Sequence, residues 1–239
     1  MGGIILGFSS RCLAERRGRI NKDTLNDYFS LGVNAIELSP GGDKNKIDIE
    51  EKDLDNLSDF EYVSLHLPND TGELLQDMLS FVERWKHIFK TIVVHPDIFS
   101  KDGFFDYTPI KDFELPFAFE NMDPKKTTGQ DKESLNQAFD DFYSQMGYDA
   151  GFVLDVNHSF LVDPSGKLQD SLLEDFGNRL KEIHISSYIT LHEPFFQAGR
   201  LELLYNLPNK PFIIESGFND LIDASIELRL VKRTLERYL

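Results

Sequence analysis

The sequence has little of several residue types, and each shortage narrows the classes of protein that it can encode. A single cysteine, Cys12, allows no internal disulfide bond and fits a reducing compartment. No apolar run approaches the roughly 20 residues that a membrane span needs, and the first residues do not resemble a secretory signal. We therefore expect a cytoplasmic protein with no membrane partner.

Basic residues are scarce relative to acidic ones. The 239 residues include 25 Lys and Arg against 41 Asp and Glu, which gives a formal net charge of −16. Since nucleic-acid binding depends on basic side chains that neutralise phosphates, a nucleic acid is a disfavoured partner without being excluded. The basic stretch from Arg11 to Lys22 follows the first predicted strand. It could bind a substrate phosphate, form a solvated helix face, or make a contact between subunits of a homo-oligomer.

Short apolar and β-branched runs recur along the whole chain and predict eight β-strands. These strands cover residues 4–9, 35–38, 62–67, 91–95, 116–120, 151–155, 182–186 and 211–215. Helical patterns lie between most of them, most clearly at 73–89, 131–146 and 220–238, whereas 97–115 is expected to form an elaborated loop with a short helix. Strands that alternate with helices predict a parallel sheet. We expect an α/β protein, a single-domain (β/α)8 TIM barrel over residues 1–239, with an open doubly wound sheet as the alternative.

Side chains that can bind a metal or move a proton lie at the ends of seven predicted strands. They are Glu37, His66, His95, Glu120, Asp155, His184 and Glu215. The C-terminal ends of barrel strands form one rim, where active sites lie. Carboxylates gathered there repel one another unless a cation offsets their charge, so the pattern predicts a divalent metal ion. Mixed imidazole and carboxylate ligands favour zinc, manganese or iron, with zinc and manganese foremost.

Four further positions are candidate substrate contacts. His158 follows Asp155 by three residues and should face the same pocket, or else make a capping hydrogen bond in its turn. His192 is either a ligand, a substrate contact or a loop residue, and Glu37 could instead pair with Arg11 or Lys44. Loop aromatic residues could wall the pocket, pack loops or form a dimer contact: Phe104, Phe105, Tyr107, Phe195 and Phe196.

Four short motifs give the chain a resemblance to a known superfamily over essentially its whole length. They are FEN at 119–121, DVNH at 155–158, HIS at 184–186 and IES at 214–216. With them the sequence resembles the xylose isomerase-like TIM-barrel superfamily, which includes sugar isomerases, epimerases and nucleases of the endonuclease IV type. The resemblance implies a (β/α)8 barrel that uses divalent metal ions.

The two branches of that superfamily imply different sites. The ketose epimerase branch implies one ion on Glu120, Asp155, His184 and Glu215, with Glu120 and Glu215 as acid and base and His158 on substrate oxygens. The endonuclease IV branch implies three zinc ions on these residues together with His66, His95, His158 and His192. Thr190 stands where one branch has Asp and the other has Arg, so neither pattern is complete.

The resulting hypothesis is a metal-dependent isomerase or epimerase of a small sugar or sugar phosphate. In this hypothesis Glu120 and Glu215 are catalytic, and one to three ions are bound by the rim residues, including His66 and His95. Other residues contact the substrate. Those contacts are assigned to His158, His192, Glu37 and Arg11. The alternatives are a zinc-dependent phosphoester hydrolase of the endonuclease IV type and a barrel that binds a ligand without catalysis.

Overall fold

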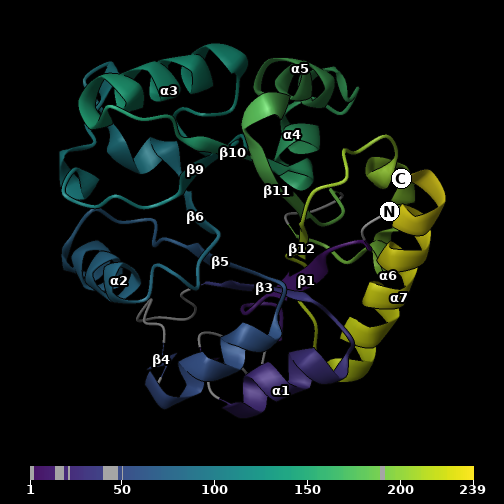
Figure 1. Ribbon diagram of the computed structural model, residues 1–239. Coiled ribbons are helices and arrows are strands. Elements are labelled where there is room, and N and C mark those ends of the chain that lie inside the picture. Colours follow the sequence, from purple (N-terminus) through teal and green to yellow (C-terminus); the bar gives the residue numbers. More distant parts are fainter. Residues whose placement is uncertain (1–2, 14–18, 21, 40–47, 50, 189–191) are drawn as a thin grey trace.

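The computed structural model describes residues 3–13, 19–20, 22–39, 48–49, 51–188 and 192–239 of the chain. Eight parallel strands close into a barrel in the order β1-β12-β11-β10-β9-β6-β5-β3 (Figure 1). They are β1 (Leu6–Ser9), β3 (Ala35–Leu38), β5 (Tyr62–His66), β6 (Thr91–Val94), β9 (Phe117–Glu120), β10 (Gly151–Asp155), β11 (Leu180–Ile185) and β12 (Phe212–Ile214). The predicted TIM barrel is confirmed, and the alternative of an open sheet is wrong.

Helices surround the barrel and cover its outer face (Figure 1). They are α1 (Lys22–Ser30), α2 (Glu73–Arg84), α3 (Lys132–Met146), α4 (Val156–Val162), α5 (Lys167–Phe176), α6 (Phe195–Ala198) and α7 (Leu221–Tyr238). Short 3₁₀ helices lie in the segments that connect these elements: η2 (Glu51–Asp59), η3 (Pro96–Phe99), η4 (Thr108–Ile110), η5 (Gly177–Arg179) and η6 (Leu201–Leu204). No helix within the described ranges is long and apolar enough to cross a membrane.

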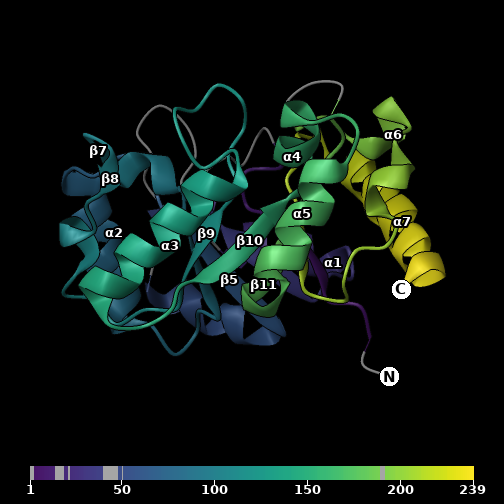
Figure 2. The ribbon, with the colours of Figure 1, turned by 90° about the horizontal axis from the view of Figure 1, so that it is seen from above.

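Two small two-stranded sheets lie outside the barrel. The first pairs β2 (Arg19–Ile20) with β4 (Asp48–Ile49), and the second pairs β7 (Ser100–Lys101) with β8 (Phe104–Phe105). The β7–β8 hairpin, with η3 and η4 beside it, is the elaborated loop predicted for residues 97–115. Figure 2 shows this hairpin and α4 towards one end of the barrel and the N-terminus towards the other.

Capping side chains set the boundaries of the two longest helices. Asp131 accepts a hydrogen bond from the Ser134 N–H at the start of α3, and Asp220 accepts from Ile222 and Asp223 at the start of α7. Both helices begin and end within one residue of the prediction. Helix α2 ends at Arg84, short of the predicted residue 89, because Trp85 leaves helical geometry and its N–H bonds the Val82 carbonyl. Trp85 still packs against the core, which extends the apolar pattern beyond the helix.

A cluster of aromatic rings fills the space between β9, α3 and the β7–β8 segment. Phe142 packs its ring centroid 5.2 Å from Tyr107 and 5.4 Å from Phe119. The Tyr107 hydroxyl donates to the Ala138 carbonyl at 3.1 Å. Tyr107, Phe105 and Phe195 are all buried core residues, which fits loop packing among the roles considered for them.

Removal of the Phe142 ring tests this packing. The ring is fully buried, so Phe142→Ala should lower the free energy of unfolding by about 3–5 kcal/mol through lost burial and a residual cavity. The neighbouring Tyr143 is 57% exposed, and Tyr143→Ala should change stability by no more than about 0.5 kcal/mol. Urea unfolding followed by circular dichroism measures both variants, and equal losses for the two would contradict the observed packing.

Candidate metal centre

Six of the predicted donors meet at the C-terminal end of the barrel. Side chains alternate between the two faces of a strand, so the last inward position on each strand points at the barrel axis. These positions are filled by His66 on β5, His95 after β6, Glu120 on β9, Asp155 on β10, His184 on β11 and Glu215 after β12. Most are almost completely buried, and the Glu215 side chain is 14% exposed. The predicted rim thus exists as one compact group of side chains.

The carboxylate of Glu120 lies at the centre of this group. Its Oε2 atom is 3.2 Å from His66 Nε2 and 3.0 Å from His95 Nε2. Its Oε1 atom is 3.4 Å from the Nδ1 atoms of both His158 and His184. A single carboxylate therefore presents one oxygen to each of two pairs of imidazoles.

Four overlapping sets of donors result among the described residues: three at the rim, and a fourth of Glu37, Glu182 and His184 on the side of His184 away from Glu120. Glu120, Asp155, His184 and Glu215 each offer a ligand atom within 4.8 Å of the others, and so do His66, His95 and Glu120. The third set is Asp155, His158 and His192. Thr190, which stands where the endonuclease IV resemblance implies Asp, lies outside the described residues. The structure thus brings together all eight metal-binding positions implied by the endonuclease resemblance, while their role as ligands remains a prediction.

Hydrogen bonds on the far side of two imidazoles show which ring nitrogen faces the centre with a lone pair. His66 donates from Nδ1–H to the Leu67 carbonyl at 2.8 Å, and His184 donates from Nε2–H to Glu182 Oε1 at 2.9 Å. In their neutral forms, the opposite nitrogens are then acceptors that face carboxylate oxygens. Two acceptors in contact require a proton or a metal ion between them, so this arrangement fits a divalent cation.

Unsatisfied polar atoms support the same fit. Among the described residues, buried Asp155 Oδ2, His95 Nδ1 and His184 Nδ1 have no hydrogen-bond partner. Buried polar atoms normally find one, and an isolated unsatisfied group costs about 1–3 kcal/mol. Asp155 Oδ2 and His184 Nδ1 belong to the same four-donor set as Glu120 and Glu215. That set has the imidazole and carboxylate chemistry of zinc, manganese and iron sites.

Asn121 fixes the part of the rim formed by β10 and α4. Its side-chain amide donates to the Asp155 carbonyl at 3.0 Å, and its Oδ1 accepts from the Asp155 N–H at 2.7 Å. The Asn121 carbonyl accepts from His158 Nδ1–H at 2.9 Å. Asp155 Oδ1 also caps α4 by accepting from the His158 N–H at 2.8 Å. This capping bond, foreseen as one role for the turn, leaves the His158 ring next to Glu120.

The remaining predicted site residues lie around this centre. His192 is in the left-handed backbone region at φ 59°, with its Nδ1 atom 3.6 Å from Glu215 Oε2 and 3.3 Å from Ser186 Oγ. Arg11 is exposed in the turn after β1. Glu37 is fully buried, with its Oε2 atom 3.1 Å from His184 Nε2. It lies behind His184, on the side opposite the atoms that face Glu120, and was not predicted there.

The charges in this group shift several pKa values. Burial opposes the charged form of His66, but the hydrogen bond to Glu120 and nearby glutamate charges outweigh it and raise the His66 pKa to about 9. The pKa of His184 is also raised, by Glu215, Glu37 and Glu120 against the effect of burial. Imidazole charges lower the pKa of Glu215 to about 2 despite its burial. Burial and the charges of Glu120 and Glu215 instead raise the pKa of Asp155.

Sequence reasoning gave no role to Asn121 and did not single out Glu182. Asn121 was part of the quoted FEN motif, so its position beside Glu120 was a usable signal. Glu182 precedes His184 by two residues on the same strand, and that spacing places both side chains on one face. An acid two positions before a candidate histidine ligand was therefore the signal for Glu182.

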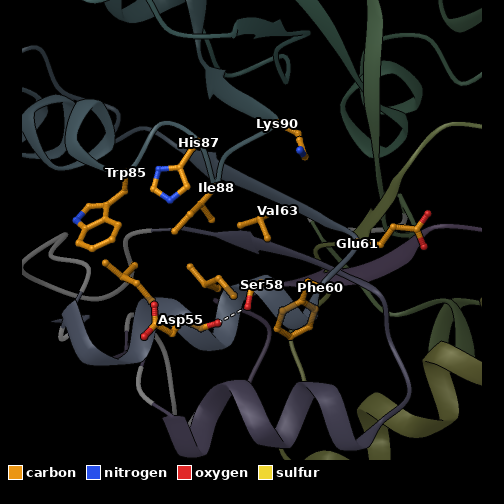
Figure 3. A pocket seen from close by; sticks show the side chains of 11 residues that line it. Asp55, Ser58, Phe60, Glu61, Val63, Trp85, His87, Ile88 and Lys90 are labelled. Carbon is orange, nitrogen blue, oxygen red and sulfur yellow. Dashed lines mark hydrogen bonds between the residues drawn. The ribbon is translucent and has the colours of Figure 1, made fainter.

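A separate cavity of about 300 Å³ lies outside the barrel wall, between η2, β5 and the end of α2 (Figure 3). Its lining includes Asp55, Glu61, Val63, Trp85 and His87, none of which is a predicted site residue. His87 is exposed, as predicted, although it follows α2 rather than lying within it.

The raised pKa of His66 makes metal binding pH-dependent. Without a metal ion this imidazole holds its proton up to about pH 9, and a bound ion has to displace it. This protonation stabilises the fold fully below the ordinary value of 6.5, and the contribution is lost as pH rises through about 9. Apparent zinc affinity should therefore increase from about pH 7 to pH 9 with proton release. Calorimetry in buffers of different ionisation enthalpy measures this, and a flat profile would refute it.

Comparisons with protein families and with curated proteins find no match. Solved structures do match. A crystal structure of AsfvAP:AG has a TM-score of 0.68 at 15% identity, covering 98% of this chain and 100% of that one. Endonuclease IV from Thermus thermophilus has a TM-score of 0.65 at 16% identity, with 97% and 99% covered. L-ribulose 3-epimerase has a TM-score of 0.58 at 11% identity, and the match covers 99% of this chain and 95% of that one. The chain therefore shares the (β/α)8 TIM-barrel fold of these three proteins.

Proposed function

We propose that this protein is a metal-dependent phosphoester hydrolase with at least two ions at the barrel rim. The observation that carries the proposal is the placement of Glu120 between two sets of donors. One of its oxygens faces His66 and His95, and the other faces His184. A carboxylate shared in this way would be a donor in both sets, and a pair of ions would supply the chemistry of displacement at phosphorus.

Two groups of side chains would hold the two ions. His66 and His95 would hold one ion, and Asp155, His184 and Glu215 would hold the other, with Glu120 a donor in both sets. When bound, the ions would activate a water molecule and stabilise the leaving oxygen.

Glu215 and Arg11 extend the site towards solvent. The lowered pKa of Glu215 keeps its carboxylate ionised, which suits an anionic donor to a bound ion. Arg11 is an exposed basic residue in the turn after β1, and its guanidinium group can bind a substrate phosphate.

The sequence favoured an isomerase or epimerase over a hydrolase, whereas the geometry of the rim favours a hydrolase. A one-ion site on Glu120, Asp155, His184 and Glu215 gives the His66–His95 pair no ligand role. Epimerisation also needs one carboxyl that delivers a proton, whereas the pKa values of Glu120 and Glu215 are both lowered, chiefly by His184, against the effect of burial.

The charge of the protein bears on the size of the substrate. A net charge of −16 disfavours a long polyanion, and an exposed Arg11 can contact one phosphate group. Endonuclease IV is among the structural neighbours, so an abasic duplex belongs in any substrate panel. We propose a small phosphomonoester or phosphodiester as the preferred substrate.

A phosphoesterase panel tests the proposal. The zinc- or manganese-loaded protein should hydrolyse at least one of p-nitrophenyl phosphate, bis-p-nitrophenyl phosphate, sugar phosphates and an abasic-site duplex. Glu120→Gln and His95→Gln should each lower that rate by about 100-fold or more because each removes a donor to an ion. His87→Gln is the control, since His87 lies on the surface away from the rim. Full activity in Glu120→Gln, or no hydrolysis of any compound, would overturn the assignment.

The second candidate is a sugar isomerase or epimerase. It is favoured by the paired carboxylates of Glu120 and Glu215, which lie 3.4 and 3.6 Å from His184 Nδ1, and by the fold shared with L-ribulose 3-epimerase. This function predicts manganese-dependent exchange of the carbon-bound proton beside the carbonyl of a ketose. Deuterium incorporation in a panel of ketoses and ketose phosphates, followed by NMR, measures it. Exchange that is lost in Glu215→Gln, together with no phosphoester hydrolysis, would establish this function in place of the first.

A further inference from the structure

Two carboxylates lie behind His184, on the side away from the metal centre. Glu182 Oε1 is 2.9 Å and Glu37 Oε2 is 3.1 Å from His184 Nε2. All three side chains are completely buried inside the barrel. One imidazole nitrogen therefore faces two carboxylates, while the other faces Glu120 and Glu215.

The strand geometry holds Glu182 in line with His184. Both residues are on β11, two positions apart, so both side chains point into the barrel. Glu182 also receives a hydrogen bond from Tyr62 on β5, and the Tyr62 hydroxyl is 2.6 Å from Thr91 Oγ1 on β6. A polar chain thus runs from the wall of the barrel to the imidazole.

An acid in this place needs a reason, because burial of a carboxylate is costly. Removing an ionised carboxylate from water costs several kcal/mol, and well-packed apolar side chains often stabilise a core as well or better. Val153 and Ile213 occupy other fully buried inward positions of the same barrel. Packing alone therefore does not call for Glu182, whereas a directional hydrogen bond to His184 does.

We propose that Glu182, flanked by Glu37, is a positioning residue for His184 as a metal ligand. By accepting the Nε2–H bond, Glu182 fixes the ring orientation and the tautomer in which the Nδ1 lone pair faces Glu120 and Glu215. The inference rests on the metal centre of the proposed function. It assigns to Glu182 no contact with substrate or with the ion itself.

Metal affinity and NMR test this role without relying on activity. Zinc affinity is measured by competition with a chromophoric chelator for wild type, Glu182→Gln and Glu182→Leu. We expect Glu182→Leu to weaken binding by about 10- to 100-fold and Glu182→Gln to weaken it less, because an amide oxygen can still accept the bond. In zinc-loaded protein labelled with ¹⁵N-histidine, the His184 Nε2–H proton, identified by its loss in His184→Asn, should shift upfield in both variants.

Glu227→Gln provides a matched control. Glu227 is also fully buried, but on α7, where its carboxylate accepts from the N–H groups of Phe195 and Phe196. This variant should lose stability while keeping its zinc affinity and the His184 proton signal. Circular dichroism checks the fold of every variant, and Glu182→Gln keeps the test valid where Glu182→Leu does not fold.

The outcomes separate the two proposals. If wild type binds no zinc or manganese, the metal centre itself is refuted, and the positioning role falls with it. If wild type binds and Glu182→Gln and Glu182→Leu bind equally well with an unshifted His184 signal, only the positioning role is refuted. Equal losses of affinity in Glu182→Gln and Glu227→Gln would show a general loosening of the barrel and would likewise overturn it.

Discussion

Alternation of side chains along eight short parallel strands determines which side chains lie together inside this barrel. On β5 the inward positions are Tyr62, Ser64 and His66, and on β11 they include Glu182 and His184. Because closure brings the strands to a common axis, the inward residues of each strand contribute to successive layers stacked along that axis. The layer at the C-terminal rim carries the candidate metal donors, and Glu182 lies in the layer beneath, next to His184. A shift of register by one residue in any of these strands would turn its donor outward.

The second constraint is that these donors share a small and largely buried space. Glu120 sits among four imidazoles, and its pKa is lowered by His184 and His95 although burial alone would raise it. Asp155 has its pKa raised by burial and by the same carboxylates that the imidazoles hold ionised. The group therefore depends on shared cations, either protons or metal ions, to remain compact. Part of the net charge of −16 belongs to this rim, where the carboxylates face imidazoles.

The strands and the candidate donors at their ends could be predicted from the sequence, because both are encoded by residues that are close together in the chain. Each strand is a short apolar run, and each donor follows the run that carries it. Contacts across the barrel are not local. The sequence suggested Arg11 or Lys44 as partners of Glu37, whereas its observed neighbour is His184, which comes from a strand that is not adjacent to β3 in the barrel. Glu182 was overlooked for a similar reason, since its importance depends on what the ring of His184 faces.

Asp155 connects two parts of the protein through one carboxyl group. Its Oδ1 atom holds the first turn of α4 through the His158 N–H, while its Oδ2 atom is directed at the rim. Anything bound at Oδ2 is thus one carboxyl group away from the backbone that carries His158, and the orientation of one donor set constrains the other. It also means that removing the whole carboxyl group, as in Asp155→Ala, is not a clean deletion of a candidate ligand: the same change uncaps a helix and removes the group beside the His158 ring, and its phenotype belongs to all three.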